Sequence, residues 1–135
     1  MKLKMIFSLV ACILLAATAC KKEVDPHIPP DVVFKTTSGY TYTDSTVGLL
    51  DTFLVGIVAT RTEDAMKSYN VSRAYDGATS TTTFYNYLLT AAESESYSHD
   101  IEIVMRNQPG TERWVFTIVD RDGNVTQKTL LFTVQ

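Results

Sequence analysis

The fold is decided by the stretch from Gly110 to Gly123, Gly-Thr-Glu-Arg-Trp-Val-Phe-Thr-Ile-Val-Asp-Arg-Asp-Gly. Trp114, Phe116 and Ile118 alternate with more polar residues, as in a strand that packs one face on a core and turns the other to water. The pair Asp122-Gly123 then supplies residues that a reversal of the chain needs. The stretch predicts a strand followed by a turn, with Trp114 in the core.

The same alternation recurs from Asp31 to the end of the chain. Apolar residues alternate in residues 52–59, 67–73, 97–105 and 130–134, and first strands are expected at 32–34 and 40–43. Turn-forming residues stand between the runs, at Gly48, Asp76-Gly77 and Pro109-Gly110. About seven short strands without a long helix predict an all-β domain over residues 31–135, an immunoglobulin-like (Ig-like) β-sandwich.

One stretch departs from the strand pattern. Leu88 to Glu95 is Leu-Leu-Thr-Ala-Ala-Glu-Ser-Glu, whose residues favour helix over strand. We expect a helical turn here that crosses from one sheet to the other.

Three stretches of the domain resemble the small Ig-like lipoproteins of Bacteroidetes. They are Phe53-Leu-Val-Gly-Ile-Val-Ala59, Ser68-Tyr-Asn-Val-Ser-Arg73 and the opening stretch 110–123. The first is similar to that family's second strand, and the last is similar to its penultimate strand and the hairpin that follows. The resemblance implies an extracellular Ig-like domain and gives no catalytic residue to carry over.

The start of the chain has the layout of a secretory signal peptide over residues 1–19. Lys2 and Lys4 precede an almost wholly apolar run, which ends in the small residues Thr18 and Ala19. The apolar run is about 15 residues long, whereas a membrane-spanning helix needs roughly 20. Cleavage is therefore expected rather than retention in the membrane.

The end of this segment, Leu15-Ala-Ala-Thr-Ala-Cys20, resembles the bacterial lipobox. The resemblance implies that Cys20 becomes the acylated first residue and carries the chain on a membrane, with palmitate among the acyl chains. Ala17 stands where the family usually has Leu. The alternative is an ordinary signal peptide cut after Ala19, which leaves Cys20 as a free thiol.

Residues 20–30 are expected to form a lipidated tether. Pro26, Pro29 and Pro30 fall in a segment with few apolar residues, where an extended chain of ten residues spans on the order of 30 Å. Lys21-Lys22-Glu23-Val24-Asp25 resembles the export signal of Bacteroidetes lipoproteins, which implies the outer face of the outer membrane. A charged tether with the domain facing the periplasm is the alternative.

Composition excludes several classes of function. The whole chain has a formal net charge of -3, with 12 Lys and Arg against 15 Asp and Glu. Because no basic cluster follows Lys21-Lys22, a nucleic-acid partner is not expected. Cys12 leaves with the signal peptide, so the mature chain has no cysteine pair for a disulfide or a metal. No cofactor is expected.

Asp120-Arg121-Asp122-Gly123-Asn124 has the beginning of a calcium loop, in which alternate carboxylates converge on a cation. An EF-hand needs Glu at the twelfth position, where this chain has Leu131. The alternative is a hairpin turn in which aspartate accepts backbone N–H bonds. No metal ligand set is assigned.

Tyrosines are the candidate binding residues. Tyr85 and Tyr87 lie on one strand face beside the hydroxyl-rich residues 81–83, and aromatic rings can stack on the apolar C–H faces of a sugar. The alternative is plain packing, because alternating tyrosine is also good strand material.

The other candidate groups do not combine into a catalytic site. His27 and His99 are far apart and have no neighbouring ligands for zinc. Ser98, His99 and Asp100 are the residue types of a hydrolase triad, but consecutive strand residues point to opposite faces. Glu93 and Glu95 could be paired carboxylates of a glycosidase, but their polar surroundings favour exposure to solvent.

Asp44-Ser45-Thr46 resembles the short signal at which Bacteroidetes proteins receive O-linked glycans. The resemblance implies a glycan on Ser45, which we expect in an exposed loop.

The sequence thus predicts a non-enzymatic lipoprotein, with an Ig-like interaction or adhesion module whose ligand is a glycan or another surface protein. The alternative is a carbohydrate-binding accessory protein of a glycan-uptake system.

Overall fold

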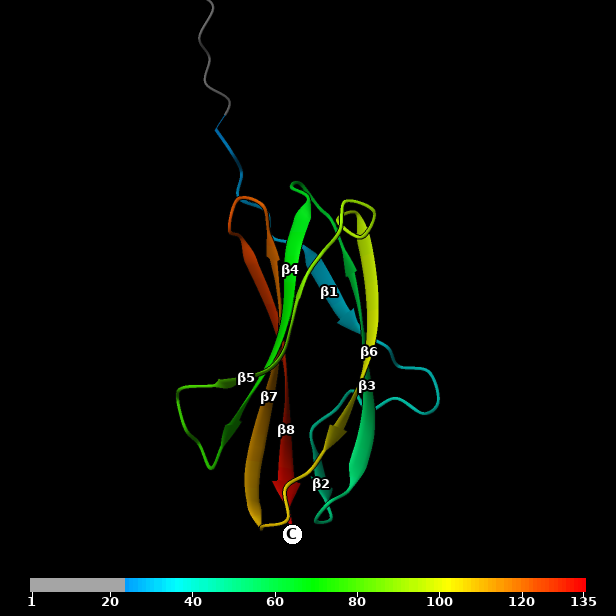
Figure 1. Ribbon diagram of the computed structural model, residues 1–135, viewed down its shortest axis with the longest axis vertical. Helices are drawn as coiled ribbons and strands as arrows, with labels where there is room; N and C mark the ends of the chain where they lie inside the picture. The colour runs from blue at the N-terminus through cyan, green and yellow to red at the C-terminus, as the bar shows by residue number, and fades with distance from the viewer. Residues whose placement is uncertain (1–23) are drawn as a thin grey trace, which may run out of the picture.

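The computed structural model describes residues 24–135, and over this range the protein is all-β (Figure 1). Eight strands follow one another: β1 (Asp31–Phe34), β2 (Ser45–Val47), β3 (Thr52–Thr60), β4 (Met66–Tyr75), β5 (Thr82–Leu88), β6 (Ser96–Val104), β7 (Gly110–Asp120) and β8 (Val125–Val134). No helix in this range is long and apolar enough to cross a membrane. The predicted signal peptide, Cys20 and residues 21–23 lie outside the described residues.

The strands form two sheets that pack face to face. One has three strands in the order β1-β3-β6, and the other has five in the order β2-β8-β7-β4-β5. All hydrogen-bonded neighbours are antiparallel except β2 and β8, which are parallel. If β1, β3 and β6 are strands A, B and E, the other sheet supplies A′, G, F, C and C′ of an immunoglobulin fold. The predicted Ig-like sandwich is confirmed.

The early part of the chain differs from the prediction. Residues 40–43 do not form a strand; Tyr40 makes an isolated bridge to Leu54, and the next strand begins at Ser45. The cause is a change of sheet, because β1 pairs with β3 in one sheet and β2 pairs with β8 in the other. β5 adds an eighth strand to the seven expected.

The core lies between the sheets and is built by the predicted alternation. Trp114, Phe116 and Ile118 on β7 are all fully buried. Phe116 meets the ring of Phe34 from the opposite sheet edge to face, with centroids 5.4 Å apart. The prediction that residues 110–123 contain a core strand with Trp114 buried is confirmed.

A buried acid, Glu112, shares the inward face of β7. Its Oε1 accepts the backbone N–H of Arg106 at 2.7 Å, and its Oε2 accepts the indole N–H of Trp114 at 3.1 Å. A buried carboxylate is tolerated only when such donors replace water. Glu112 therefore ties the connection between β6 and β7 to the core tryptophan.

The connection between β5 and β6 crosses from one sheet to the other, as expected, but it is not helical. It contains a turn in which the N–H of Glu93 donates to the carbonyl of Thr90 at 3.1 Å. The Glu93 carboxylate in turn accepts the N–H and the hydroxyl of Thr90. The bond from the Thr90 N–H to Glu93 is that of a helix capping box, but only this one turn forms before β6 begins at Ser96, so the helical prediction was wrong.

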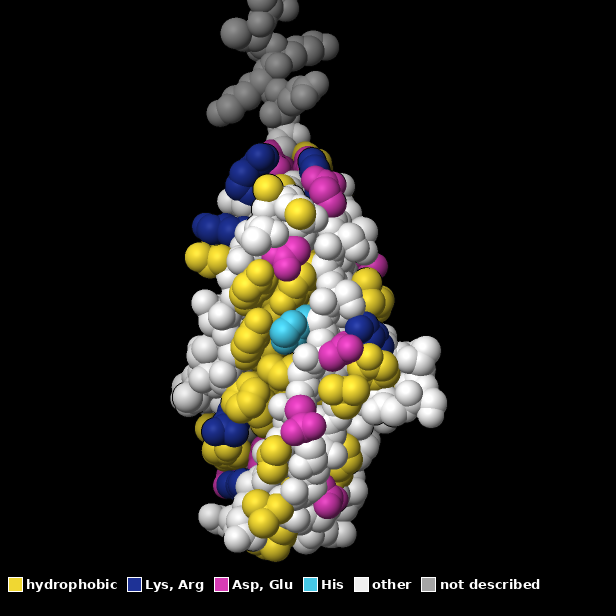
Figure 2. Space-filling view, turned by 45° about the vertical axis from the view of Figure 1, so that its right-hand side comes forward, with side chains coloured by type: hydrophobic (Ala, Val, Ile, Leu, Met, Phe, Trp, Pro, Cys, Tyr) yellow, Lys and Arg dark blue, Asp and Glu magenta, His cyan; other side chains and the backbone are white. Residues whose placement is uncertain are grey.

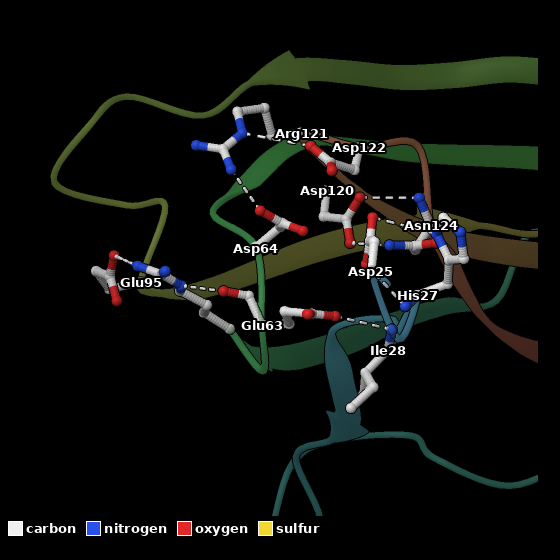
Figure 3. Close-up of polar contacts among 11 residues, drawn as sticks. Asp25, His27, Ile28, Glu63, Asp64, Glu95, Asp120, Arg121, Asp122 and Asn124 are labelled. Carbon is white, nitrogen blue, oxygen red and sulfur yellow. Dashed lines mark hydrogen bonds and ion pairs between the residues drawn. The ribbon is translucent and has the colours of Figure 1, made fainter. Parts of the chain in front are cut away.

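The last residues of the predicted tether are attached to the domain (Figure 3). The N–H of Ile28 donates to Glu63, and the Thr62 hydroxyl donates to the carbonyls of Ile28 and Pro29. The hydroxyl of Thr126 donates to the carbonyl of Pro30. Any free reach of the tether therefore ends at Ile28, three residues before β1.

Candidate functional site

The candidate site is on the side of the sandwich where β5 and β6, each the last strand of its sheet, face one another. Tyr85 and Tyr87 from β5 meet Tyr97 and His99 from β6 across this gap. We call these four side chains the aromatic seam. Tyr85 and Tyr87 share a face, as predicted, and this face is turned toward the core rather than away from it.

The four rings of the aromatic seam are nearly parallel. Tyr85 lies 4.8 Å from His99 with 22° between their planes, and Tyr87 lies 5.8 Å from Tyr97 with 15°. Along the strands, Tyr85 and Tyr87 are 6.4 Å apart and Tyr97 and His99 are 5.9 Å apart. The arrangement is two opposed pairs of rings, one pair from each sheet.

The aromatic seam lies at the surface. Tyr85, Tyr87 and His99 are half-buried, whereas Tyr97 is only 6% exposed. Figure 2 shows a stripe of hydrophobic side chains that runs along this side of the molecule beside the histidine. No pocket is found over residues 24–135, so a ligand would lie on an open aromatic surface.

Tyr69 lies beneath the aromatic seam and is fully buried. Its ring is 5.9 Å from Tyr85, 5.6 Å from Tyr97 and 5.5 Å from His99, tilted by about 60° in each case. Burial raises the pKa of its hydroxyl, which has no hydrogen-bond partner among the described residues. The aromatic seam therefore rests on a fifth ring that stays uncharged.

Polar groups at the end of the aromatic seam are already paired. The hydroxyl of Tyr87 donates to both carboxylate oxygens of Glu93, at 3.1 and 3.3 Å, and this bond raises the pKa of Tyr87. Bonds from the Thr90 backbone and hydroxyl lower the pKa of Glu93. Glu93 is thus an ionised acceptor beside the aromatic seam.

His99 gives the aromatic seam a dependence on pH. Burial lowers the pKa of His99 below its ordinary value of 6.5. The unfolded chain therefore binds a proton more readily than the folded protein, and the free energy of unfolding falls as the pH drops below 6.5. We expect urea denaturation to show a smaller loss of stability between pH 7 and pH 5 for His99→Phe than for the natural chain. Equal losses in the two proteins would contradict a neutral, packed His99.

Ser98, His99 and Asp100, the residue types of a hydrolase triad, are separated, because consecutive side chains of a strand point to opposite faces. Asp100 faces the outside of the three-stranded sheet, where Lys35 donates to its Oδ1 at 2.5 Å and Tyr40 donates to its Oδ2 at 2.8 Å. The Lys35 bond lowers the pKa of Asp100. His99 lies on the other face, against Tyr85. Ser98, His99 and Asp100 therefore form no relay.

The carboxylate of Asp120 stabilises a turn and does not face an open calcium-binding loop. It is fully buried, and its two oxygens accept the N–H of Asn124 at 2.8 Å and the amide of Asn124 at 2.9 Å. Gly123 has the positive φ of 91° that the turn needs. The geometry is that of the hairpin alternative.

Sequence reasoning missed an acidic group at the end of the domain that the tether joins (Figure 3). Oxygens of Asp25, Asp64 and Asp122 lie within 4.8 Å of one another. Arg121 forms ion pairs with Asp64 at 2.5 Å and with Asp122 at 3.4 Å, and His27 contacts Asp25 at 3.3 Å. Arg121 thus compensates two of the acids, which lie far apart in the sequence.

The two candidate glycosidase carboxylates have different partners. Glu93 binds Thr90 and Tyr87, whereas Glu95 forms an ion pair with Arg61 at 2.5 Å. The arrangement does not present them as a pair.

Ser45 was expected in an exposed loop, but it lies in a strand. It is the first residue of β2, is half-buried and lies opposite Phe132. Its hydroxyl donates to the carbonyl of Thr43 at 3.2 Å, and Asp44 accepts the N–H of Leu131 at 2.8 Å. The placement was wrong because the strand expected at 40–43 forms here instead; the glycan itself stays a prediction.

No family model matches the chain, and no curated protein matches it. Solved structures show a likeness of fold. A chitin-binding domain from Burkholderia pseudomallei has a TM-score of 0.49 and 8% identity, over 70% of this chain and 58% of that one. A family 123 glycoside hydrolase from Clostridium perfringens has a TM-score of 0.49 and 9% identity, over 78% of this chain and 27% of that one. Murine CRIg has a TM-score of 0.40 and 10% identity, over 78% of this chain and 98% of that one.

Proposed function

We propose that the chain is a membrane-anchored lipoprotein outside the cytoplasm, whose Ig-like sandwich is a non-catalytic recognition module. The proposal is based on the aromatic seam. Half-buried aromatic rings at the surface offer contact area with little loss of conformational freedom, and they are enriched where proteins bind their partners. The ligand is expected to contact Tyr85, Tyr87 and His99.

A recognition module fits the state of the acids and bases in the described residues. Glu93, Glu95 and Asp100 each have their own partners, and His99 is stacked between tyrosines. Catalysis by an activated nucleophile needs that nucleophile, a base and an orienting group in contact. The described side chains offer binding surfaces in place of such a set.

The orientation of the domain agrees with attachment at one end. The described chain enters at one end of the long axis, and the C-terminus lies at the other (Figure 1). Because β5 and β6 form one side of the sandwich, the aromatic seam lies along the molecule rather than at its attached end. A lipid on Cys20 would leave this side open to ligands.

Carbohydrate binding is the second candidate function, and the half-buried aromatic rings at the surface favour it. A sugar needs a flat aromatic surface for its C–H face and polar groups nearby for its hydroxyls. The aromatic seam supplies the rings, and Glu93 and the neutral imidazole of His99 supply acceptors at the same surface. An accessory protein of a glycan-uptake system would use the site in this way.

Removing two rings of the aromatic seam should strongly weaken glycan binding. We expect the full chain, purified in mild detergent, to bind at least one glycan on an array. The double variant Tyr85→Ala and Tyr87→Ala should lose roughly 30-fold or more in affinity, if each ring contributes about 1–3 kcal/mol as it does where nucleobases stack on aromatic side chains.

Tyr42→Ala is the matched control, since Tyr42 is 43% exposed and lies outside the aromatic seam. Circular dichroism confirms that each variant is folded. Binding to no glycan would exclude the carbohydrate candidate and leave a protein ligand. Glycan binding that survives the double change would place the site elsewhere and contradict the role of the aromatic seam.

A further inference from the structure

A second feature on the same side of the sandwich points to the chemistry of the ligand. We propose that Arg73, held among aromatic rings, binds the carboxylate of an acidic sugar, so that the ligand is a glycan that contains uronic acid. This inference rests on the carbohydrate candidate above. It adds a residue and a ligand class that the tyrosines alone do not give.

The position of Phe84 depends on a β-bulge. Val71 pairs with Tyr85 and Ser72 pairs with Thr83, so Phe84 is an extra residue on β5. A bulge redirects a side chain relative to its neighbours. Phe84 meets Trp114 edge to face at 5.0 Å and is still 44% exposed. It therefore presents an aromatic surface next to Tyr85 in the chain.

Arg73 lies beside this exposed ring. Its guanidinium carbon is 5.4 Å from the ring centre of Phe84, 5.4 Å from Tyr75 and 5.6 Å from Trp114. Contacts of this kind fix the planar group in place and leave the N–H donors at its rim available. Thr82, which is exposed, pairs with Arg73 across the strands and adds a hydroxyl at the surface.

The other arginines of the chain have acceptors, and Arg73 has none among the described residues. Its guanidinium donates no hydrogen bond and makes no ion pair there, and its nitrogens are not among the buried unpaired atoms. Acceptors of the other four are Glu95 for Arg61, Asp76 for Arg106, the carbonyls of Ala78 and Thr79 for Arg113, and Asp64 for Arg121. Arg73 is therefore a cation that a ligand can reach.

A neighbouring acid, Asp76, binds a different arginine. Arg106 holds both oxygens of Asp76, at 2.5 and 2.8 Å, and this pair lowers the pKa of Asp76. Arg106 also lies 5.0 Å from the ring of Tyr75, which thus contacts two guanidinium groups. Asp76 is therefore held by Arg106 and is not a partner of Arg73.

A uronic acid has two groups that match this site, its carboxylate and its sugar ring. A carboxylate is planar and accepts two parallel N–H bonds from one guanidinium, and such charge-assisted bonds are roughly twice as strong as neutral ones. The C–H face of the same sugar can stack on Phe84, while its hydroxyls meet Thr82. A neutral sugar would leave the Arg73 donors to water.

The test compares acidic and neutral forms of the same polymers with the full chain. Affinity electrophoresis in mild detergent would use polygalacturonate, alginate and hyaluronan, each beside its methyl-esterified form. We expect retardation by at least one acidic polymer, at least 10-fold weaker binding to its ester, and weaker binding as salt is raised. Arg73→Gln should lose about 10-fold or more, since hydrogen bonds to charged groups are the strong class.

Arg61→Gln is the matched control, because it removes the same charge as Arg73→Gln but from an arginine that is paired with Glu95. Its affinity should stay within about 2-fold, as expected of an exposed ion pair outside the site. Arg73→Lys keeps the stem and the charge but not the planar fork, so it should also lose affinity. If Arg73→Gln does not fold, the comparison of acid and ester on the natural chain still decides the question.

The outcomes separate this inference from the proposed function. Equal retardation by acid and ester, or acid binding that Arg73→Gln leaves unchanged, would overturn the role of Arg73. If neutral glycans then still bind through Tyr85 and Tyr87, the carbohydrate candidate stands. Binding of no glycan at all would overturn both.

Discussion

Trp114→Ala is expected to lower the free energy of unfolding by about 3–5 kcal/mol, the range for removing a large aromatic side chain from a core. Trp114 is fully buried on the central strand β7. The change also removes the indole N–H that Glu112 accepts, which leaves a buried carboxylate oxygen without a donor. A domain of this size has about 5–15 kcal/mol of stability in total, so the variant should be near the limit of folding.

Thermal and urea unfolding followed by circular dichroism measure this effect. We expect the melting temperature to fall by on the order of 15 °C. Leu131→Ala on β8 is the control, because Leu131 is 42% exposed and a surface change should cost within about 0.5 kcal/mol. Similar losses for the two variants would mean that Trp114 is not the centre of the core.

Cys20→Ser is expected to abolish lipidation of the chain. Burial of acyl chains contributes about 0.8 kcal/mol per methylene, so two or more chains give stable attachment where one is marginal. The natural chain should take up labelled palmitate and partition with detergent. The Cys20→Ser variant should take up none, and should run as an unprocessed precursor or as a soluble form.

Cys12→Ser is the matched control for this experiment. Cys12 lies in the predicted signal peptide, so its loss should leave processing and labelling unchanged. An inhibitor of lipoprotein signal peptidase should reproduce the effect of Cys20→Ser on the natural chain. A mature protein that runs unchanged and stays on the membrane in the Cys20→Ser variant would disprove the lipid anchor.

The fold could be predicted from the sequence because its signal is local. Alternation around Trp114 and turn residues such as Asp76-Gly77 give strands and reversals without knowledge of their partners. The structure has positive φ at both Asp76 and Gly77. The strand expected at 40–43 failed because alternation does not reveal where a chain changes sheets, which depends on pairing with the distant β8.

The candidate site could be predicted only in part. Strand parity put Tyr85 and Tyr87 on one face, but their contacts with Tyr97 and His99 follow from how the two sheets pack. The surroundings of Arg73 depend on a bulge and on Trp114, which is 41 positions away along the sequence. Contacts of this kind leave no periodic signal in a single sequence.

The proposed binding site is tested by mapping the ligand onto the aromatic seam. The measurement is an NMR titration of the full chain in detergent micelles with the glycan that binds best on the array, followed through the ring signals of His99 and the tyrosines. The proposed site predicts that the largest shifts fall on Tyr85, Tyr87 and His99, and that the signals of Tyr42 do not move. Shifts confined to the outer face of either sheet, with the aromatic seam unchanged, would contradict it.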